Sequence, residues 1–109
     1  MKIQFVDNKI RSLCEKQEVA NKKLGEVCAR KLRTRLSDIE AVNCVTDLVA
    51  GNPHPLKGDR MGQFAVDLNG GYRLVFMPDH DPYPIYLDGG IDWSQVINVC
   101  IVYIGNYHD

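Results

Sequence analysis

A hairpin pattern near the middle of the chain constrains its fold more than any other feature. Two alternating runs, FAVDL (64–68) and YRLVF (72–76), flank NGG (69–71), whose residue types accept the positive φ angles of a tight turn. A three-residue loop places Asp67 opposite Arg73 on one face and the large apolar residues on the other, whereas a two-residue loop would direct Arg73 among them. We therefore predict a three-residue loop in an antiparallel hairpin.

The N-terminal third has the pattern of a strand followed by helices. KIQFV (2–6) alternates polar and apolar residues, and Asp7 or Asn8 can cap the helix that follows. Apolar residues then recur at three- and four-residue spacing from Lys9, and again through a longer helix over residues 18–39. This pattern predicts an amphipathic helical hairpin.

Two segments are predicted to be loops. In GNPHP (51–55) both prolines lack an amide donor and hold the residues before them in extended shapes, so His54 is fixed between them. Residues 78–95 contain three prolines, a Gly-Gly pair and four aspartates, which is typical of a long excursion from a sheet. Within it, DHD (79–81) suggests a metal site, but three adjacent residues rarely converge on one ion, so a solvated loop is favoured.

The order of these elements predicts the fold class. INVCIVYIG (97–105) is apolar on both faces, as an interior strand should be. A chain of 109 residues is expected to form one domain, spanning 1–109, around one core. We predict an α+β fold in which the N-terminal strand and the helical hairpin pack on one face of a mostly antiparallel, twisted sheet.

The other face of that sheet is predicted to be open. Arg73 lies on it, next to the loop that contains His54 and to the chain end with Tyr107 and His108. A cation flanked by histidines on an open sheet face is expected to form a concave binding site.

Charge is divided unevenly along the chain. Residues 1–37 carry ten Lys/Arg and four Asp/Glu, a net of +6, whereas residues 38–109 carry three and ten, a net of −7. The three cations of the second part are Lys57, Arg60 and Arg73. Isolated cations in an acidic stretch either meet a specific anionic ligand or pair locally with Asp59 or Asp67, and the sequence leaves both readings open.

A second set of cations lies on the predicted long helix, within a sector of roughly 100° away from the apolar residues. Its members are Lys22, Lys23, Arg30 and Arg33. This face is either solvated or a surface for RNA or for an acidic partner chain.

Composition excludes several other classes of protein. No apolar run approaches a membrane span or a signal-peptide core, so we expect a cytoplasmic protein without membrane contact. The net charge of −1 argues against a nonspecific coat for nucleic acids. Four widely spaced cysteines, Cys14, Cys28, Cys44 and Cys100, lack zinc-site spacing and are expected to be reduced and mostly buried. Neither a metal nor a cofactor is expected.

The order of motifs in the second half resembles one known family. HPLKGDR (54–60) is followed by GQF (62–64), by the hairpin with Arg73 and by NYHD (106–109). This series is similar to the HigB branch of the RelE/ParE toxin superfamily, and GGIDW (89–93) is similar to an insert in some relatives. The resemblance covers the motif and its strands closely, the chain end in part and the helices only in pattern, and it implies a RelE-like fold.

The resemblance also implies a reaction. Members of that family are ribonucleases that enter the ribosomal A site and cut mRNA there without a metal ion. The ribose 2′-hydroxyl attacks the adjacent phosphate, so the reaction needs a base, cations for the crowded phosphate and an acid for the leaving oxygen. By resemblance, His54 and His108 transfer protons. Lys57 and Arg73 bind the phosphate, and Tyr107 stacks on a base or positions a water.

Implied partners are the ribosome, mRNA and a cognate antitoxin, expected to be of the helix-turn-helix type. Candidate RNA-binding residues beyond the catalytic set are Arg60, Lys22, Lys23, Arg30 and Arg33. Arg60 can alternatively pair with Asp59 and hold its loop. Two other functions remain open: a non-enzymatic inhibitor, as in the gyrase-poisoning ParE relatives, and an inactive member that only binds an antitoxin within a repressor complex.

Overall fold

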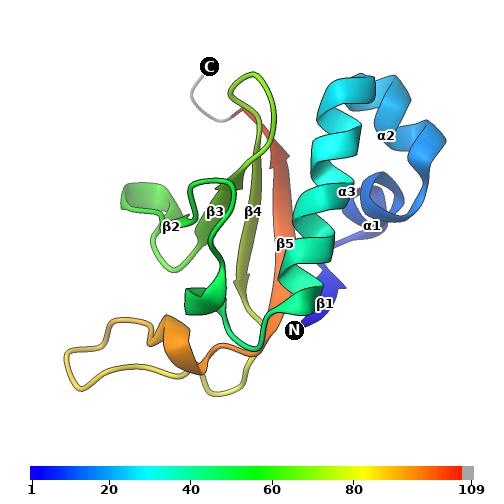
Figure 1. The fold of residues 1–109 in the computed structure, drawn as a ribbon. Helices are drawn as coiled ribbons and strands as arrows, with labels where there is room; N and C mark the ends of the chain where they lie inside the picture. Colours follow the sequence, from blue (N-terminus) through cyan, green and yellow to red (C-terminus); the bar gives the residue numbers. More distant parts are fainter. Residues whose placement is uncertain (107–109) are drawn as a thin grey trace.

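The computed structural model describes residues 1–106, in which a five-stranded sheet carries three α-helices on one face (Figure 1). The helices are α1 (Asn8–Glu15), α2 (Gln17–Leu24) and α3 (Glu26–Ala41). The strands are β1 (Lys2–Phe5), β2 (His54–Pro55), β3 (Phe64–Asp67), β4 (Arg73–Pro78) and β5 (Asn98–Gly105). Single turns of 3-10 helix form η1 (Val45–Asp47), η2 (Gly58–Arg60) and η3 (Trp93–Gln95). No helix within residues 1–106 is both long and apolar enough to cross a membrane.

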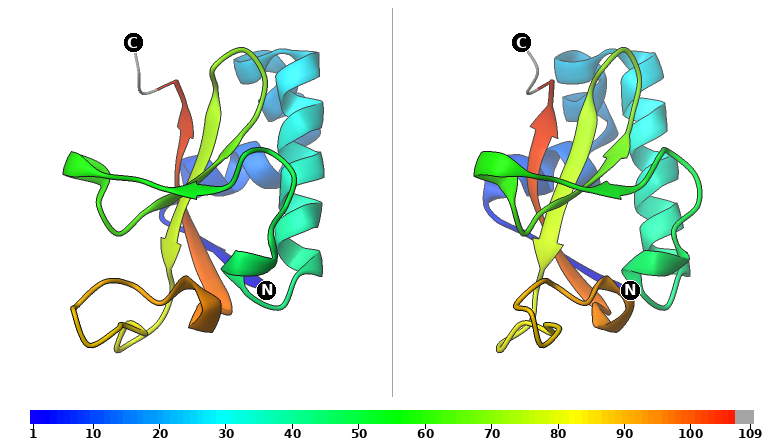
Figure 2. Two further views of the ribbon diagram at one scale, coloured as in Figure 1. Left: turned by 60° about the vertical axis from the view of Figure 1, so that its left-hand side comes forward. Right: turned by 90° about the vertical axis from the view of Figure 1, so that its left-hand side faces the viewer.

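The sheet has the strand order β1-β5-β4-β3-β2. β1 runs parallel to β5, and the other neighbouring pairs are antiparallel. The helices stay together on one side of the sheet as the molecule is turned (Figure 2). The predicted α+β fold is confirmed, and so is the interior position of the apolar C-terminal strand, because β5 lies between β1 and β4.

The β3–β4 hairpin has the predicted register. Asp67 pairs with Arg73 across the two strands. The N–H of Leu68 donates to the carbonyl of Tyr72 at 2.9 Å, which leaves a three-residue loop between them. The predicted loop length is therefore confirmed, and with it the placement of Asp67 and Arg73 on the face away from the helices.

The core lies between α3 and the sheet. Leu32 and Ile39 of α3 pack against Leu74, Phe76 and Ile101, and each of these side chains is almost completely buried. Burying a side chain of this size stabilises the fold by about 1.5–3 kcal/mol. This packing fixes α3 against one face of the sheet. The other face carries no α-helix of residues 1–106, and β2 and the loop that follows it lie beside it.

The helices differ from the prediction at Gly25. The predicted helix over residues 18–39 is wrong as one continuous element, because Gly25 separates α2 from α3 with φ +83° and ψ 158°. Only glycine adopts this backbone region readily, and glycine is unfavourable inside a helix. The predicted single sector of four cations is therefore also wrong: one pair lies on α2 and the other on α3. All four side chains, Lys22, Lys23, Arg30 and Arg33, are exposed.

A bulge in β5 changes which side chains face away from the helices. Val75 pairs with Tyr103 and Phe76 pairs with Ile101, so Val102 is an extra residue in β5. Ile101 points into the core, and without the bulge Tyr103 would point there too. The extra residue instead places Tyr103 on the same face as Arg73.

Residues 79–92 form a projecting arm at the lower end of the sheet in Figure 1. A bridge between Ile85 and Ile91 closes the arm. His80 Nε2 accepts the N–H groups of Ile97 (3.1 Å) and Asn98 (3.2 Å), and so ties the base of the arm to the start of β5. Within residues 1–106 no three His, Cys, Asp or Glu side chains form a cluster suited to a metal ion.

All four cysteines are free thiols, but they are less buried than predicted. Only Cys28 is fully buried, whereas Cys14, Cys44 and Cys100 are partly exposed. Burial, with a smaller contribution from the charge of Glu15, raises the pKa of Cys14 to about 12. Desolvation penalises the thiolate, so this side chain stays protonated and unreactive near neutral pH.

Candidate functional site

An open groove of about 820 Å³ lies on the sheet face away from the helices. Its walls are β2, the loop that follows β2, and the start of β4. Four predicted site residues line it: His54, Lys57, Arg60 and Arg73. Asn52, Asp59 and Gln63 contribute its other polar side chains. The groove thus gathers every cation of residues 38–106, although they are spread over seventeen positions of the chain.

His54 is held in an extended conformation by the prolines on both sides and pairs with Ala65 of β3. Its Nδ1 lies 2.7 Å from the carbonyl oxygen of Asn52. A carbonyl oxygen only accepts, so Nδ1 carries a hydrogen, and in the neutral ring Nε2 is the atom with the free electron pair. The imidazole is therefore oriented by its own loop and presents Nε2 as a proton acceptor.

Arg73 forms an ion pair with Asp67, its cross-strand neighbour. Nε of Arg73 lies 2.8 Å from Oδ1 of Asp67, but the N–H does not point along this line well enough to form a hydrogen bond. Nη1 donates to the carbonyl of Tyr72 at 3.2 Å. Local pairing with Asp67, one of the two readings left open by the sequence, is thus realised, while the same side chain still lines the groove.

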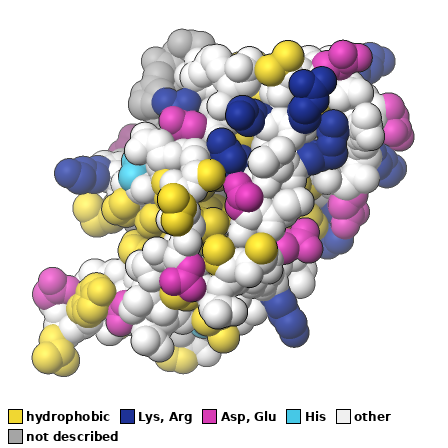
Figure 3. Space-filling model, in the orientation of Figure 1, with side chains coloured by type: hydrophobic (Ala, Val, Ile, Leu, Met, Phe, Trp, Pro, Cys, Tyr) yellow, Lys and Arg dark blue, Asp and Glu magenta, His cyan; other side chains and the backbone are white. Residues whose placement is uncertain are grey.

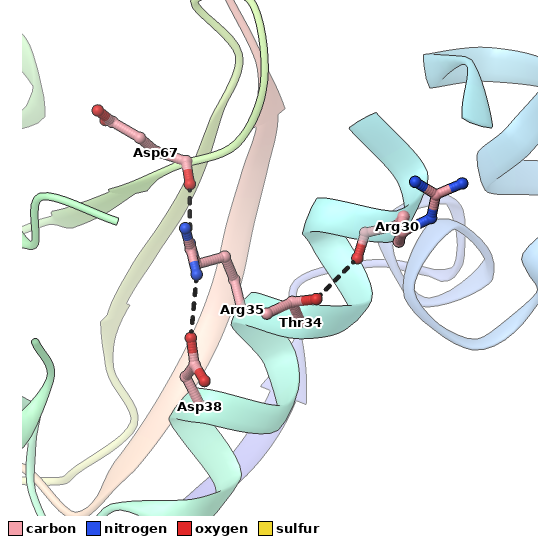
Figure 4. A network of polar contacts seen from close by, with 5 residues as sticks. All are labelled: Arg30, Thr34, Arg35, Asp38 and Asp67. Carbon is pink, nitrogen blue, oxygen red and sulfur yellow. Dashed lines mark hydrogen bonds and ion pairs between the residues drawn. The ribbon is translucent and has the colours of Figure 1, made fainter. Parts of the chain in front are cut away.

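Asp67 is itself fixed from the helical side by Arg35, which sequence reasoning missed (Figure 4). Nε of Arg35 donates to the Asp67 carbonyl at 3.0 Å, and Nη1 pairs with Asp38 at 3.2 Å. The Asp67 N–H donates to the carbonyl of Gly51 at 2.7 Å. A Cβ on Gly51 would lie 2.5 Å from Arg35 Nε, so this close approach requires glycine. Asp67 is therefore held through both of its backbone polar groups, and its carboxylate points away toward Arg73.

The contact between Arg35 and Asp67 is hard to predict from the sequence, because a neighbouring residue of α3 bonds only within the helix (Figure 4). Thr34 lies on the same stretch of α3, and its hydroxyl donates to the Arg30 carbonyl at 3.1 Å without leaving the helix. Arg35, one residue further on, is only 12% exposed and reaches the hairpin. The one available signal is its place beside the buried Leu36, with Asp38 three residues later as an ion-pair partner.

Arg60 packs on Tyr103, a residue that sequence reasoning also missed. The guanidinium carbon lies 4.4 Å from the centre of the Tyr103 ring, within the range of a cation–π contact. Nη1 donates to Gln63 Oε1 at 3.0 Å. A Cβ on Gly105 would lie 2.7 Å from the Tyr103 hydroxyl, so this hydroxyl lies over the strand partner of Arg73. Arg60 thus contacts the sheet through Tyr103 and its own loop through Gln63, whereas the sequence suggested Asp59 as its partner.

The sheet register explains how the two sides of the site are spaced. His54, Ala65, Val75 and Tyr103 lie in one row across β2, β3, β4 and β5. The two middle residues are small or β-branched and are fully buried. His54 therefore lies at one end of this row, and Tyr103, with Arg60 packed on its ring, lies at the other end.

The other predicted site residues are not part of the groove as described. Lys22, Lys23, Arg30 and Arg33 lie on the helices, and none of them lines it. Figure 3 shows Lys and Arg side chains gathered over α3 and the upper part of the molecule, while acidic and hydrophobic side chains mark the arm. Tyr107 and His108 lie outside the described residues. The last described residue, Asn106, lies beside Gly71, whose Cβ would be 2.8 Å from the Asn106 side-chain nitrogen.

No protein-family model and no curated protein matches this chain. Solved structures do. A YoeB/ParE toxin from Agrobacterium tumefaciens is 12% identical with a TM-score of 0.62, over 98% of this chain and 99% of that one. The YoeB-YefM complex from Staphylococcus aureus matches at 15% identity and TM-score 0.59, over 96% and 94%. The YoeB dimer from Staphylococcus aureus matches at 17% and 0.58, over 100% and 98%.

These likenesses extend over essentially the whole of each chain and show that the fold is shared with YoeB/ParE toxin structures. The RelE-like architecture expected from the motif order is therefore confirmed. In the same fold, this chain places an imidazole with an available nitrogen beside three cations. Such a set can bind a phosphodiester and accept a proton from a nearby hydroxyl.

Proposed function

We propose that this chain is the toxin of a type II toxin–antitoxin pair, of the HigB kind, and that it cuts mRNA on the ribosome. The observation that carries the proposal is the groove in which His54, Lys57, Arg60 and Arg73 meet on the open face of a toxin fold. Each of these residues belongs to the motif series that suggested the reaction.

The proposed reaction is attack of a ribose 2′-oxygen on the adjacent phosphorus. The 2′-oxygen–phosphorus bond forms, the bond from phosphorus to the 5′-oxygen breaks, and the products are a 2′,3′-cyclic phosphate and a 5′-hydroxyl. His54 Nε2 takes the 2′-proton, because Nδ1 is committed to Asn52. Arg73 and Lys57 hold the phosphate oxygens, Arg73 with its planar fork and Lys57 as a point charge. Proton transfer by a positioned side chain contributes roughly 10²–10⁴-fold to rate.

Protonation of the leaving 5′-oxygen is assigned to His108, with Tyr107 stacking on a base or positioning a water. Support for this assignment comes from the motif series alone. His108 is therefore the second residue to test.

The proposed protein partner is a cognate antitoxin of the helix-turn-helix type. Support comes from a solved structure with the same fold that is a toxin complex, the YoeB-YefM complex. The exposed cations of α2 and α3 offer a face for an acidic chain or for ribosomal RNA, and the ribosome and mRNA remain the proposed target.

The test is induced expression with mapping of RNA 5′ ends, alone and together with any helix-turn-helix protein encoded beside it. We expect growth arrest with cuts in translated mRNA, and loss of both in His54→Gln, Arg73→Ala and Lys57→Ala. Lys9→Ala is the matched control for Lys57→Ala, because Lys9 is an exposed lysine of α1 that does not line the groove. Circular dichroism and thermal unfolding show that each variant is folded.

Three outcomes separate the competing functions. Arrest without RNA cuts, unchanged in His54→Gln, would identify a non-enzymatic inhibitor of the gyrase-poisoning kind. Absence of arrest with antitoxin binding intact would identify an inactive member of a repressor complex. Cuts that depend on His54 and Arg73 but not on Lys9 support the ribonuclease.

A further inference from the structure

A second groove of about 330 Å³ lies beside the first. One wall is the loop after β2, with Leu56, Met61 and Gly62, and the other is the end of the arm and the start of η3, with Ile91 and Trp93. Figures 1 and 2 show this loop and the arm projecting on the same side of the molecule. The two walls approach closely at Gly62, where a Cβ would lie 3.7 Å from the Ile91 side chain.

The two grooves adjoin each other, because Pro55, Leu56 and Gln63 line both. Their chemistry differs sharply. The first contains three cations, one aspartate and an imidazole, whereas no charged side chain among residues 1–106 lines the second. Met61 is 75% exposed, and Trp93 packs against Phe64 with ring centres 4.9 Å apart. The second groove therefore suits a neutral, flat, apolar group attached to an anion that occupies the first.

Gln63 stands at the junction of the grooves with its amide already oriented. Its Oε1 accepts from Arg60 Nη1 at 3.0 Å, which fixes the amide so that its NH₂ group is the end left to donate. A donor at the boundary between a cationic groove and an apolar groove matches a base that carries an acceptor on its edge.

We propose that the second groove binds the nucleobase adjacent to the phosphate held in the first groove. This inference rests on the proposed RNA-cutting function and extends it to sequence preference. The base contacts Met61 and the Trp93–Ile91 wall, and Gln63 donates a hydrogen bond to its edge. The arm thereby takes part in choosing where the RNA is cut.

The chain offers a direct reporter, since Trp93 is its single tryptophan. We would titrate the protein at low salt with single-stranded RNA of roughly six nucleotides, 2′-O-methylated so that it cannot be cut. The same RNA carrying one abasic position is the comparison, with inorganic phosphate as a probe for the first groove alone. Anisotropy of a labelled copy of each RNA measures total binding independently of Trp93.

We expect the intact RNA to change Trp93 fluorescence and phosphate to leave it unchanged. An abasic position next to the bound phosphate should remove the signal and weaken binding roughly 5- to 150-fold, the range that stacking of one base supplies. Met61→Ala should weaken binding of the intact RNA roughly 2- to 10-fold and leave the abasic RNA unaffected. Leu87→Ala, which removes a fully exposed side chain of the arm outside the groove, is the matched control and should bind like the wild type.

The outcomes distinguish this inference from the function on which it rests. RNA binding that requires Arg73 but is equal for intact and abasic RNA would overturn the base site and leave the proposed function in place. Absence of RNA binding by the wild type at low salt would overturn the base site, whereas the proposed function is overturned only if mapping of RNA 5′ ends in cells shows no cuts. If Met61→Ala weakened only the complex with the antitoxin, the groove would be a protein contact and the base site would again be overturned.

Discussion

The carboxylate of Asp67 lies 2.8 Å from Nε of Arg73, on the face of the sheet opposite the helices. Asp67 is anchored through its backbone to Arg35 of α3 and to Gly51, so the carboxylate is a fixed point beside the groove. Arg73 is thereby held by one edge of its guanidinium, with a second nitrogen on the Tyr72 carbonyl. Each of these contacts can be removed separately.

Replacing Asp67 with asparagine should show whether Asp67 acts by orienting the Arg73 side chain or by compensating its positive charge. Asp67→Asn keeps both backbone hydrogen bonds but removes the ion pair, so Arg73 loses its alignment while its positive charge becomes less compensated. We expect kcat for RNA cutting to fall roughly 10- to 100-fold, because small misplacement of a catalytic group is costly, while KM stays the same or falls. Asp47→Asn, at an exposed aspartate in η1, is the control. A rise in KM at constant kcat would contradict this role.

Removing Arg35 should destabilise the protein through the hairpin. Arg35→Met leaves the part-buried Asp67 carbonyl and the Asp38 carboxylate without this partner, at a cost of about 1–3 kcal/mol in the free energy of unfolding. Arg33→Met, at an exposed arginine of the same helix, should change it by less than about 0.5 kcal/mol. Urea unfolding of both variants measures the difference, and equal values would show that the Arg35 contacts contribute nothing.

Gly25→Ala tests the break between α2 and α3. An alanine at φ +83° and ψ 158° would be strained, and we expect a loss of about 1–3 kcal/mol in the free energy of unfolding. Thermal unfolding measures the loss, with Ser37→Ala at an exposed helical position as the control. Greater stability together with a larger helical signal in circular dichroism would mean that α2 and α3 prefer to merge, contrary to the structure.

Cys14 should make stability depend on pH in the alkaline range. Burial raises its pKa in the folded protein to about 12 from the ordinary value of 9.0. Above pH 9 the unfolded chain releases this proton and the folded protein keeps it, so the free energy of unfolding falls as pH rises, and below pH 9 the group has no effect. Thermal unfolding between pH 8 and about 11 should show this slope in the wild type and a shallower one in Cys14→Ala. Equal slopes in the wild type and in Cys14→Ala would show that Cys14 does not cause the pH dependence of stability.

The hairpin register could be predicted because its determinants are local. The Asn-Gly-Gly turn and the alternation of FAVDL and YRLVF fix which residues oppose each other within thirteen positions of the chain. The placement of Asp67 against Arg73 follows from that register alone. His54 was predictable for a similar reason, since its conformation depends on its two proline neighbours.

The features that were missed depend on distant parts of the chain. Apolar spacing continues on both sides of Gly25, so the pattern gives no sign of the break there. Tyr103 lies on the same sheet face as Arg73 only because of a bulge, and a bulge leaves no mark in an apolar run. Arg35 meets Asp67 across thirty-two positions, a contact that exists only once the helix has packed on the sheet.

The short strand β2 has a consequence for assembly. Leu56 donates its N–H inward to Gln63 of the adjoining chain segment at 2.9 Å. Because successive residues of a strand direct their amides to opposite sides, Pro53 and Pro55 stand where outward-facing N–H groups would be. This edge of the sheet therefore offers no regular row of donors, which protects it against edge-to-edge aggregation.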